Sequence, residues 1–165
     1  MSRREGERVS QDFDSYVARH GRELVRLAFV LTGDDADAQD IVQEALTRAY
    51  PRWERISSLE DAHAYVRRMV VNARTSWWRR TRRRELPVAE VHSNTVAADP
   101  ADEDDSLWLA CLALPRDQRV AVVLRYYEGL SYADIAALTA CAEATARSRV
   151  FRGLETLRGA FEEEE

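Results

Sequence analysis

Apolar and polar positions divide this chain into two helical blocks separated by a break in the pattern. In the first block, apolar residues recur at the i, i+3, i+4 spacing that places them on one face of an α-helix. They are Phe13, Tyr16, Val17, Leu24, Val25, Leu27, Ala28 and Leu31. A second inward face follows, made of Ala38, Ile41, Val42, Ala45, Leu46 and Ala49. The pattern therefore predicts two helices packed against each other.

Residues at the ends of these stretches predict where the helices stop and start. Gly33 can adopt the left-handed conformation that ends a helix, and Asp34 or Asp35 can cap the next one. Pro51 closes the second helix. A third, long helix is expected to begin near Ser58 or Leu59 and to run to about residue 84.

The break in the pattern covers residues 86–105. It contains two prolines and no arginine, and acids gather at its end as Asp99, Asp102, Glu103, Asp104 and Asp105. Such a stretch is typical of an exposed, flexible, acidic linker.

The second block predicts four helices. The first contains Leu107, Leu109, Leu112 and Leu114, and Pro115 starts the next in a favoured first-turn position. Gly129 can end that helix, and Ser131 can cap a short helix over residues 132–138. A last helix is expected over about residues 142–160. The chain is thus predicted to be all-α, with two small helical domains over 11–85 and 106–160.

Composition narrows the class of protein. The chain has 165 residues, 45% of them hydrophobic and 32% charged, and its formal net charge is -5. Its two cysteines and three histidines are scattered along the sequence, whereas a zinc site needs clustered ligands. No metal site, cofactor or catalytic residue is therefore expected. Neither a signal peptide nor a membrane span is apparent, so a cytoplasmic protein with no direct membrane insertion is expected.

Positive charge is concentrated in residues 65–84 of this acidic chain. That segment contains no acid and combines eight arginines with three aromatic side chains, Tyr65, Trp77 and Trp78. Arginines neutralise phosphates, and indole rings can stack on exposed bases. The segment favours nucleic-acid binding over a merely solvated face, although a charge cluster alone does not decide between them.

The second block also contains a helix-turn-helix pattern. The short helix is expected to bury Ile135 and Leu138, and the long one Ala146, Val150 and Leu154 or Leu157. The opposite face of the long helix carries Thr145, Ser148, Phe151 and Arg152, flanked by Arg147 and Arg149. This combination suits a recognition helix in the major groove. The alternative is an ordinary three-helix bundle with an incidental arginine face.

A cluster of acids opens the second helix of the first block. Asp37, Asp40 and Glu44 share one helix face by their i, i+3, i+7 spacing. Acids in a first helical turn are favoured by the helix dipole, and no histidine accompanies them. A face for a protein partner is therefore a better interpretation than a metal site.

Taken together, these motifs resemble a bacterial sigma factor of the extracytoplasmic-function class. Region two is matched by Leu27-Ala-Phe-Val-Leu-Thr-Gly-Asp34, by Asp37 to Tyr50, by Trp53, and by Tyr65-Val-Arg-Arg-Met-Val-Val-Asn72. The ending Ser76-Trp-Trp-Arg-Arg80 is similar to an actinobacterial subgroup. Region four is matched by Leu114-Pro-Arg-Asp-Gln-Arg119, by Leu124 to Ala136, and by Thr145-Ala-Arg-Ser-Arg149.

The resemblance implies three sets of contacts. The helix with Asp37, Asp40, Gln43 and Glu44 would dock on core RNA polymerase. Contacts to the minus-ten element would come from Trp53, Arg67, Arg68, Asn72, Arg74, Trp77 and Arg80. Contacts to the minus-thirty-five element would come from Thr145, Arg147, Ser148, Arg149, Phe151 and Arg152. Promoter DNA and core polymerase are the implied partners, an anti-sigma factor could hold the protein, and a monomer is expected when it is free.

This chain departs from the family pattern at the turn before the recognition helix. Ala142, Ala144 and Ala146 stand where the family usually has Ser or Pro, then Gly, then Val. Loss of a capping hydroxyl costs about 1 kcal/mol. The exact start of that helix is therefore open.

Two other classes of protein compete with the sigma factor. A helix-turn-helix regulator that does not join polymerase would leave the arginine-rich helix and the acidic face without a role. A metal-dependent nuclease using Asp34, Asp35, Asp37 and Asp40 lacks a histidine or lysine beside those acids. A sigma factor that is not itself an enzyme is the interpretation that uses both blocks.

Overall fold

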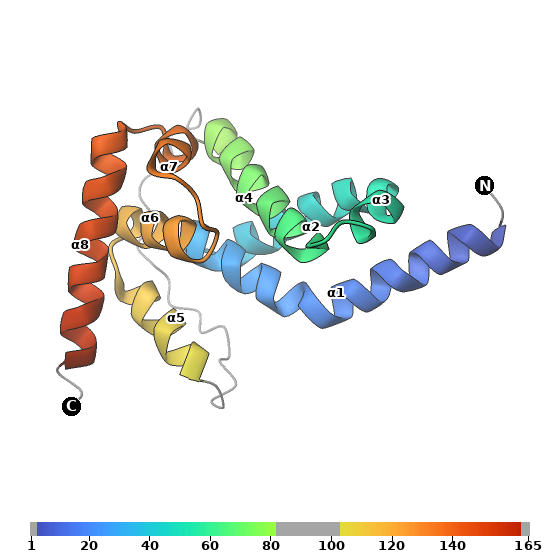
Figure 1. Ribbon diagram of the computed structural model, residues 1–165, viewed down its shortest axis with the longest axis horizontal. Helices are drawn as coiled ribbons and strands as arrows, with labels where there is room; N and C mark the ends of the chain where they lie inside the picture. Colours follow the sequence, from blue (N-terminus) through green and yellow to red (C-terminus); the bar gives the residue numbers. More distant parts are fainter. Residues whose placement is uncertain (1–2, 82–102, 163–165) are drawn as a thin grey trace. The chain divides into compact units, whose positions relative to one another are not determined.

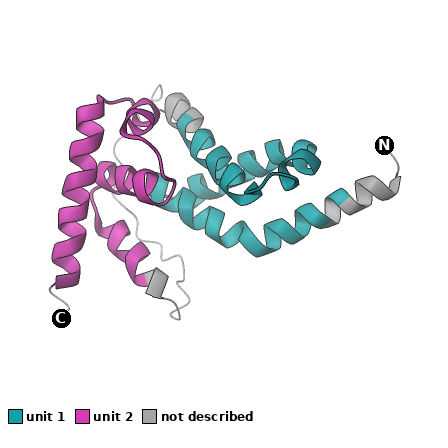
Figure 2. Cartoon of the chain, in the orientation of Figure 1, with its two compact units in different colours: residues 1–86 teal, residues 87–165 magenta. Residues whose placement is uncertain are grey.

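The computed structural model describes residues 3–81 and 103–162, and within these ranges it describes the side chains of residues 9, 12–75 and 106–162. The described residues form helices and contain no strand, which confirms the all-α prediction. They divide into two compact units, residues 1–86 and 87–165, and Figure 2 colours the two units separately. The predicted linker, residues 86–105, lies almost entirely outside the described residues.

The described residues of unit 1, 3–81, form four α-helices and one 3₁₀ turn, drawn from blue to green in Figure 1. They are α1 (Arg3–Thr32), α2 (Asp35–Ala49), η1 (Tyr50–Arg52), α3 (Trp53–Ser57) and α4 (Ala62–Thr81). Helix α1 packs against α2 and α4, and α2 packs against α4. The three long helices therefore enclose one core.

That core follows the predicted apolar faces. Leu24, Leu27 and Leu31 of α1 are fully buried. They are joined by Ile41 of α2 and by Val66 and Val70 of α4, which are buried to the same degree. Burying each such aliphatic side chain contributes roughly 1.5–3 kcal/mol, so this core is the main source of stability of unit 1.

The boundary between α1 and α2 forms as the sequence predicts. Gly33 has φ 77°, in the left-handed region that favours glycine, and its N–H donates to the Phe29 carbonyl at 2.7 Å. Asp34 then caps α2, because its side chain accepts from the Asp37 N–H at 3.0 Å. Leu46, which the pattern places inward, is only half-buried.

The start of the long basic helix differs from the prediction. The chain does not enter it near Ser58: Pro51 first lies in η1, α3 follows, and α4 begins at Ala62. The Asp61 carboxylate accepts from the Ala64 N–H at 2.8 Å and so caps α4. A short helix such as α3 spans too few residues to produce a helical period in the sequence.

Unit 2 contains α5 (Glu103–Ala113), α6 (Arg116–Tyr126), α7 (Tyr132–Thr139) and α8 (Glu143–Glu162). Helix α8 packs along α6 and also contacts α7 and α5. One side of its core joins Cys111, Leu114, Val122 and Leu157. On the other side, Ile135 of α7 meets the buried face of α8, where Ala146 and Val150 lie. Leu138, predicted to be buried, is half-buried.

A glycine allows α6 and α8 to approach closely. A Cβ atom on Gly153 would lie 2.6 Å from Cγ2 of Val122, a distance that real Cβ contacts do not tolerate. Valine is stiff about χ1, so its methyl group cannot move aside easily. Gly153 therefore sets the distance between the two central helices of unit 2.

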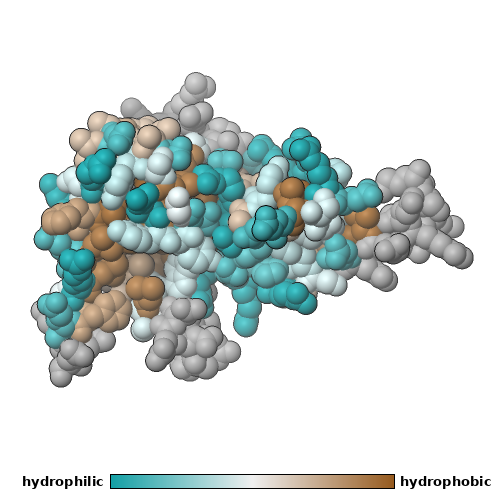
Figure 3. Space-filling model, in the orientation of Figure 1, coloured by the Kyte–Doolittle hydropathy of each residue, from teal (hydrophilic) through white to brown (hydrophobic). Residues whose placement is uncertain are grey.

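The two units present different visible faces in Figure 3. The visible face of unit 1 is mostly hydrophilic, whereas apolar residues gather along α5 and α8 of unit 2. Leu107 and Leu109 of α5 are about half exposed, which is consistent with this view. In the described part of the chain, no helix is both long and apolar enough to cross a membrane.

Candidate nucleic-acid interface and acidic docking face

Helix α2 presents the predicted acidic face to solvent. Ala38, Ile41 and Ala45 are buried against the neighbouring helices, and this packing fixes the rotation of α2. On the opposite face, Asp40 and Gln43 are exposed, while Asp37 and Glu44 are partly exposed. The structure thus brings all four predicted docking residues onto one helix.

One member of this face also makes an ion pair. Arg48 Nη2 lies 2.8 Å from Glu44 Oε1, one turn apart on α2, and the arginine is largely exposed. An exposed i, i+4 pair stabilises a helix by only about 0.3–0.5 kcal/mol. The pair therefore orients Glu44, whose Oε1 is buried while its side chain as a whole is 25% exposed.

The Trp53 side chain is buried and not exposed to solvent. It is 3% exposed, and its indole Nε1 donates to Asp12 Oδ2 at 3.0 Å. Its ring packs on Tyr16 and Phe13, with centroid distances of 4.7 and 5.2 Å. In this conformation Trp53 fastens α3 to α1, and it offers no face on which a base could stack.

The predicted minus-ten residues of α4 fall into different environments. Arg68 and Asn72 are exposed, and Arg67 is partly exposed. Arg74 is 6% exposed in the free chain. The side chains of Trp77 and Arg80 lie outside the described residues. Arg68 and Asn72, four positions apart, therefore mark the described part of this polar face.

Unit 1 also contains a side-chain cluster that the sequence did not suggest. His20 and Glu23 of α1 meet His63, which lies in the first turn of α4. The His63 ring is stacked on that of His20 with a centroid distance of 4.1 Å. Burial and the neighbouring His63 lower the pKa of His20. The two histidines are 43 positions apart, which is why the sequence gave no sign of the cluster.

The acids that a nuclease would use do not form a comparable cluster. Among the described residues, the group that could hold a metal ion is His20, Glu23 and His63, and it contains none of Asp34, Asp35, Asp37 or Asp40. Asp34 is occupied in capping α2. The geometry gives no support to a metal-dependent active site at the start of α2.

In unit 2, short-range bonds form the helix-turn-helix. Ser131 caps α7 by accepting from the Asp134 N–H at 3.1 Å. The chain leaves α7 through Ala140, whose φ of 51° is unusual for a residue other than glycine. The Ala142 carbonyl then accepts from the N–H groups of Thr145 and Ala146, each at 3.0 Å. Helix α8 thus starts at Glu143 although Ala142 has no side-chain cap to offer.

The exposed face of α8 matches the predicted recognition face. Thr145, Arg147 and Arg152 are exposed, and Ser148 is partly exposed. Phe151 is 59% exposed, which is unusual for so large an apolar side chain. Ala146 is fully buried on the inner face. Helix α8 therefore has one exposed, mostly polar face and one buried apolar face, as the sequence predicts.

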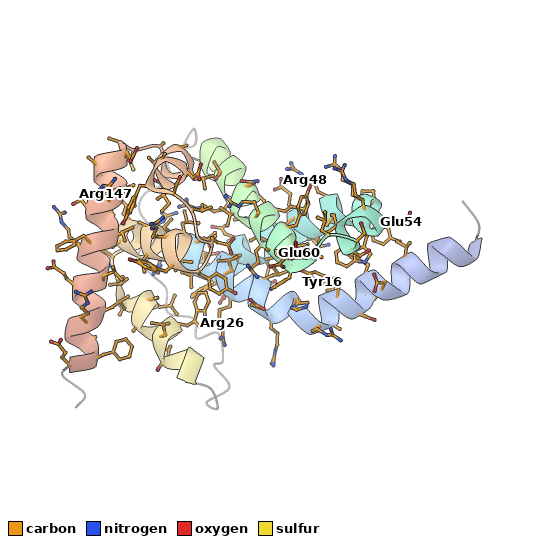
Figure 4. All side chains as sticks on the ribbon, viewed as in Figure 1. Tyr16, Arg26, Arg48, Glu54, Glu60 and Arg147 are labelled. Atoms are coloured by element: carbon orange, nitrogen blue, oxygen red, sulfur yellow. The ribbon has the colours of Figure 1, made fainter. Side chains whose placement is uncertain are left out.

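Two arginines of this face already have partners within unit 2. Arg149 pairs with Asp117 of α6 at 2.7 Å, and Arg147 pairs with Glu143 at 3.2 Å. Arg147 and Arg125 also lie over the Tyr132 ring, 4.4 and 4.6 Å from its centroid. Figure 4 labels Arg147 on α8, beside α7. These contacts position the arginines before any ligand arrives.

A buried arginine supports the α5–α6 corner, and sequence reasoning missed this role. Arg119 is 2% exposed, and its Nη1 donates to the Leu112 carbonyl at 3.2 Å. Burial lowers the pKa of its guanidinium. The burial of Val120 on the adjacent position gives no hint that Arg119 is buried as well. Arg119 is buried because the end of α5, where Leu112 lies, packs beside the first turns of α6.

Comparison with known proteins connects these two units to described families. Residues 16–84 match the family model Sigma-70 region 2, and residues 104–157 match Sigma-70, region 4. The RNA polymerase sigma-E factor of Streptomyces coelicolor is 38% identical over 151 residues, covering 89% of this chain and 84% of that protein. The ECF RNA polymerase sigma factor SigE of Mycolicibacterium smegmatis is 33% identical, covering 88% of this chain and 60% of that protein.

A solved structure shares the fold. The sigma factor RpoE from Bartonella quintana, crystallised in complex with the anti-sigma factor NepR, matches with a TM-score of 0.60 and 26% sequence identity. The match covers 92% of this chain and 98% of that chain.

Proposed function

The chain belongs to the extracytoplasmic-function sigma factors of the sigma-70 family, and from this premise we propose that it joins core RNA polymerase and directs initiation at promoters with minus-ten and minus-thirty-five elements. The observation that carries the proposal is the presence of two units in one chain, one with an exposed acidic helix face and one with a helix-turn-helix. A regulator that does not join polymerase would need only the second.

The polymerase-binding surface of the proposal is the face of α2 with Asp37, Asp40, Gln43 and Glu44. Asp40 and Gln43 are exposed at its centre. Acidic faces attract basic partner surfaces and orient them during encounter. This assignment also gives the acid cluster a role that requires no metal ion.

The minus-ten surface is narrower than the sequence suggested. Arg68 and Asn72 are available on α4, and Trp77 and Arg80 remain proposed contacts further along this helix. Trp53 and Arg74 are buried, so a role for them in DNA binding requires unit 1 to rearrange. We assign to them the positioning of α3 and α4 in the free protein.

The minus-thirty-five surface is the exposed face of α8. Arg152 and Ser148 can reach base edges or phosphates in the major groove, and Phe151 can contact a thymine methyl group. Arg147 and Arg149 are held by Glu143 and Asp117. Arginines so held suit phosphate contacts, which fix register on the duplex.

The protein on this proposal breaks and forms no covalent bond, because polymerase performs the chemistry. Opening the promoter requires unstacking of bases, at a few kcal/mol for each flipped base, and aromatic and arginine contacts offset part of that cost. The acidic segment 86–105 is proposed to connect the two units within the polymerase complex. A cytoplasmic location, a monomeric free state and an actinobacterial subgroup marked by Ser76 to Arg80 are further parts of the proposal.

An anti-sigma protein is a proposed additional partner. The support is the RpoE of Bartonella quintana, whose structure was solved with the anti-sigma factor NepR. A protein that covered the α2 face would exclude polymerase, because both would need Asp40 and Gln43.

Run-off transcription with purified core RNA polymerase on a genomic promoter library tests the proposal. The wild-type chain is expected to produce discrete start sites that share two upstream elements. The Asp40→Ala/Gln43→Ala variant is expected to lose core binding about tenfold or more, consistent with truncation of central interface residues. Glu54→Ala, which removes an exposed acid from α3 instead, serves as the charge-matched control.

A second pair of variants separates the two DNA surfaces. Arg152→Ala is expected to weaken use of the minus-thirty-five element while leaving core binding intact, at a cost of about 1–3 kcal/mol in recognition. Arg158→Ala, exposed further along α8, is its control. DNA binding without any new start site would instead favour the regulator that does not join polymerase.

A further inference from the structure

Side chains from two distant parts of unit 1 converge between α1 and the start of α4. His20 and Glu23 lie three positions apart on α1, and His63 lies in the first turn of α4. One nitrogen or carboxylate oxygen from each of the three residues lies within 4.8 Å of the others. None of these residues belongs to the surfaces assigned above to polymerase or DNA.

We propose that His20, Glu23 and His63 form a binding site for a divalent transition-metal ion of the Zn²⁺ type. Two imidazole nitrogens and one carboxylate oxygen are a ligand set that such ions use, with water at the fourth position. The proposal goes beyond the sigma-factor function and does not depend on it.

The two distances from the Glu23 carboxylate to the histidine nitrogens are close to those around a tetrahedral ion. Ligand atoms bound about 2.0–2.1 Å from a tetrahedral Zn²⁺ lie about 3.3–3.4 Å from one another. Glu23 Oε2 lies 3.1 Å from His63 Nε2 and 3.8 Å from His20 Nδ1, one value on each side of this spacing. The rings of His20 and His63 are stacked in this structure, with centroids 4.1 Å apart, so one of the two rings must rotate before both nitrogens can bind the same ion.

The buried ring nitrogen of His63 points to a ligand as well. Its Nε2 is buried, and although Glu23 Oε2 lies 3.1 Å away, the two atoms do not have the geometry of a hydrogen bond. A metal ion between nitrogen and oxygen would satisfy both lone pairs. The two atoms thus approach each other without a hydrogen bond, as two ligands of one ion do.

Tyr16 provides the support that metal-binding histidines usually have. Its hydroxyl lies 2.8 Å from His63 Nδ1, and the side chain is labelled in Figure 4 where α1 passes the start of α4. If Nδ1–H donates to this hydroxyl, Nε2 carries the lone pair that a metal needs. Tyr16 is itself held by the buried Trp53 ring, 4.7 Å away.

The cluster is accessible to an ion from solution. The side chains of His20, Glu23 and His63 are 27, 41 and 17% exposed. Positive charge on Arg19 acts on His20 and lowers the affinity for a cation. The single carboxylate of Glu23 offsets part of this repulsion.

Metal binding would fasten α1 to the first turn of α4. That turn follows directly after the loop of residues 58–61, which Asp61 ends by capping α4. An ion that binds the folded state and not the unfolded chain stabilises unit 1 by mass action. The site would thus act on the loop that precedes the basic helix.

Zn²⁺ binding by the full-length chain tests the proposal directly. Competition against a chromophoric chelator is expected to show one ion per wild-type chain, and Zn²⁺ is expected to raise the Tm. His63→Gln should weaken binding about tenfold or more, since it removes a ligand whose supporting partners alone are worth about 10–100-fold. His92→Gln, which changes the third histidine of the chain, should leave binding unchanged.

Three further variants keep the test decisive. Tyr16→Phe keeps the aromatic ring and should weaken binding about tenfold through loss of the supporting hydroxyl. If His63→Gln fails to fold by circular dichroism, the more exposed His20→Gln replaces it with the same expectation. A chain with both cysteines changed to serine should bind Zn²⁺ as the wild type does.

Three results would overturn the proposal. The first is the absence of saturable Zn²⁺ binding below millimolar concentration, and the second is unchanged affinity in His63→Gln or its substitute. The third is a thiolate charge-transfer band in the absorption spectrum of the Co²⁺-loaded chain, which would assign binding to Cys111 or Cys141 instead. None of these readouts requires polymerase, so failure here is distinct from failure of the proposed function.

Discussion

The two units place their polar residues by different means. In unit 2, Arg147 pairs with Glu143 one turn away on α8, and Arg149 pairs with Asp117 on α6, 32 positions earlier in the chain. In unit 1, the polar network joins Trp53 to Asp12 and His63 to Tyr16, residues more than 40 positions apart. The recognition face thus combines a local pair with one longer-range pair, whereas both of these contacts in unit 1 join residues more than 40 positions apart.

This difference has a consequence for binding. Arg147 and Arg149 of α8 already make ion pairs in the free protein, and any restriction of their side chains lowers the entropy cost of association. In unit 1, a tryptophan and an arginine that the sequence assigned to DNA lie inside the domain. Use of Trp53 by a ligand would require part of the α1–α3 packing to open. The predictions below test this contrast, beginning with the largest expected effect.

Replacement of Trp53 should show most clearly that unit 1 depends on long-range packing. Trp53→Ala removes a nearly fully buried indole and should destabilise unit 1 by about 4 kcal/mol, the usual cost of truncating a core aromatic residue. Urea unfolding followed by circular dichroism measures the loss. Trp53→Phe, which keeps most of the packing, should cost less than half as much.

The contrary result for Trp53 is equally definite. If Trp53→Ala kept the stability of the wild type and lost only promoter binding, the tryptophan would be a DNA contact and the packing role assigned to it would be wrong.

The close approach of α6 and α8 should make Gly153 the most sensitive small residue of unit 2. Gly153→Ala places a methyl group against Val122, and the overpacking should destabilise unit 2 by about 2 kcal/mol. Thermal unfolding and amide hydrogen exchange in α6 and α8 report the effect.

Gly159 provides a matched control on the same helix. A Cβ atom there meets nothing within 4 Å, so Gly159→Ala should stabilise α8 by roughly 0.5–1 kcal/mol through helix propensity. Equal effects at the two positions would show that the approach to Val122 does not matter.

Each unit has a helix whose N-terminus is capped by a side chain, so the same substitution can be compared in the two units. Asp34→Ala and Ser131→Ala each remove a side chain that accepts from the backbone N–H three residues on. Each should cost about 1 kcal/mol, with the loss confined to its own unit. Hydrogen exchange resolves the two locations, and a loss shared by both units would contradict their treatment as separate folding units.

The smallest effect is expected at the turn before α8. Ala140 has a left-handed φ of 51°, which is strained for any residue with a Cβ atom. Ala140→Gly should therefore stabilise unit 2 slightly, by about 0.5 kcal/mol, after the added freedom of glycine in the unfolded chain is subtracted. A decrease in Tm would show that the strain at this turn is negligible.

Much of the fold was accessible from the sequence because its signals are local. The left-handed Gly33, the Asp34 and Ser131 caps, and the glycine-bounded corner at Gly129 formed as predicted. The buried and exposed faces of α2 and α8 also followed from their periodicity. The start of α4 was placed three residues too early, because α3 is too short to leave a periodic pattern.

Some residues of the candidate sites were predictable from the sequence and others were not. Exposure of Asp40, Gln43, Phe151 and Arg152 follows from helix faces alone, since each lies opposite an apolar stripe. Trp53 and Arg74 could not be judged this way, because tryptophan lies both at surfaces and in cores, and an arginine is buried only where the fold gives it partners.

By itself, the sequence determined the all-α class, the two helical blocks, the family, and the faces of the helices that meet solvent. These depend on spacing of 3 to 4 residues and on capping residues, which act over one or two turns. Only the tertiary structure decided that Trp53, Arg74 and Arg119 are inside and that His20, Glu23 and His63 meet. Such contacts depend on how helices pack when tens of residues separate them in the sequence, and a pattern that extends over one or two turns contains no information about that packing.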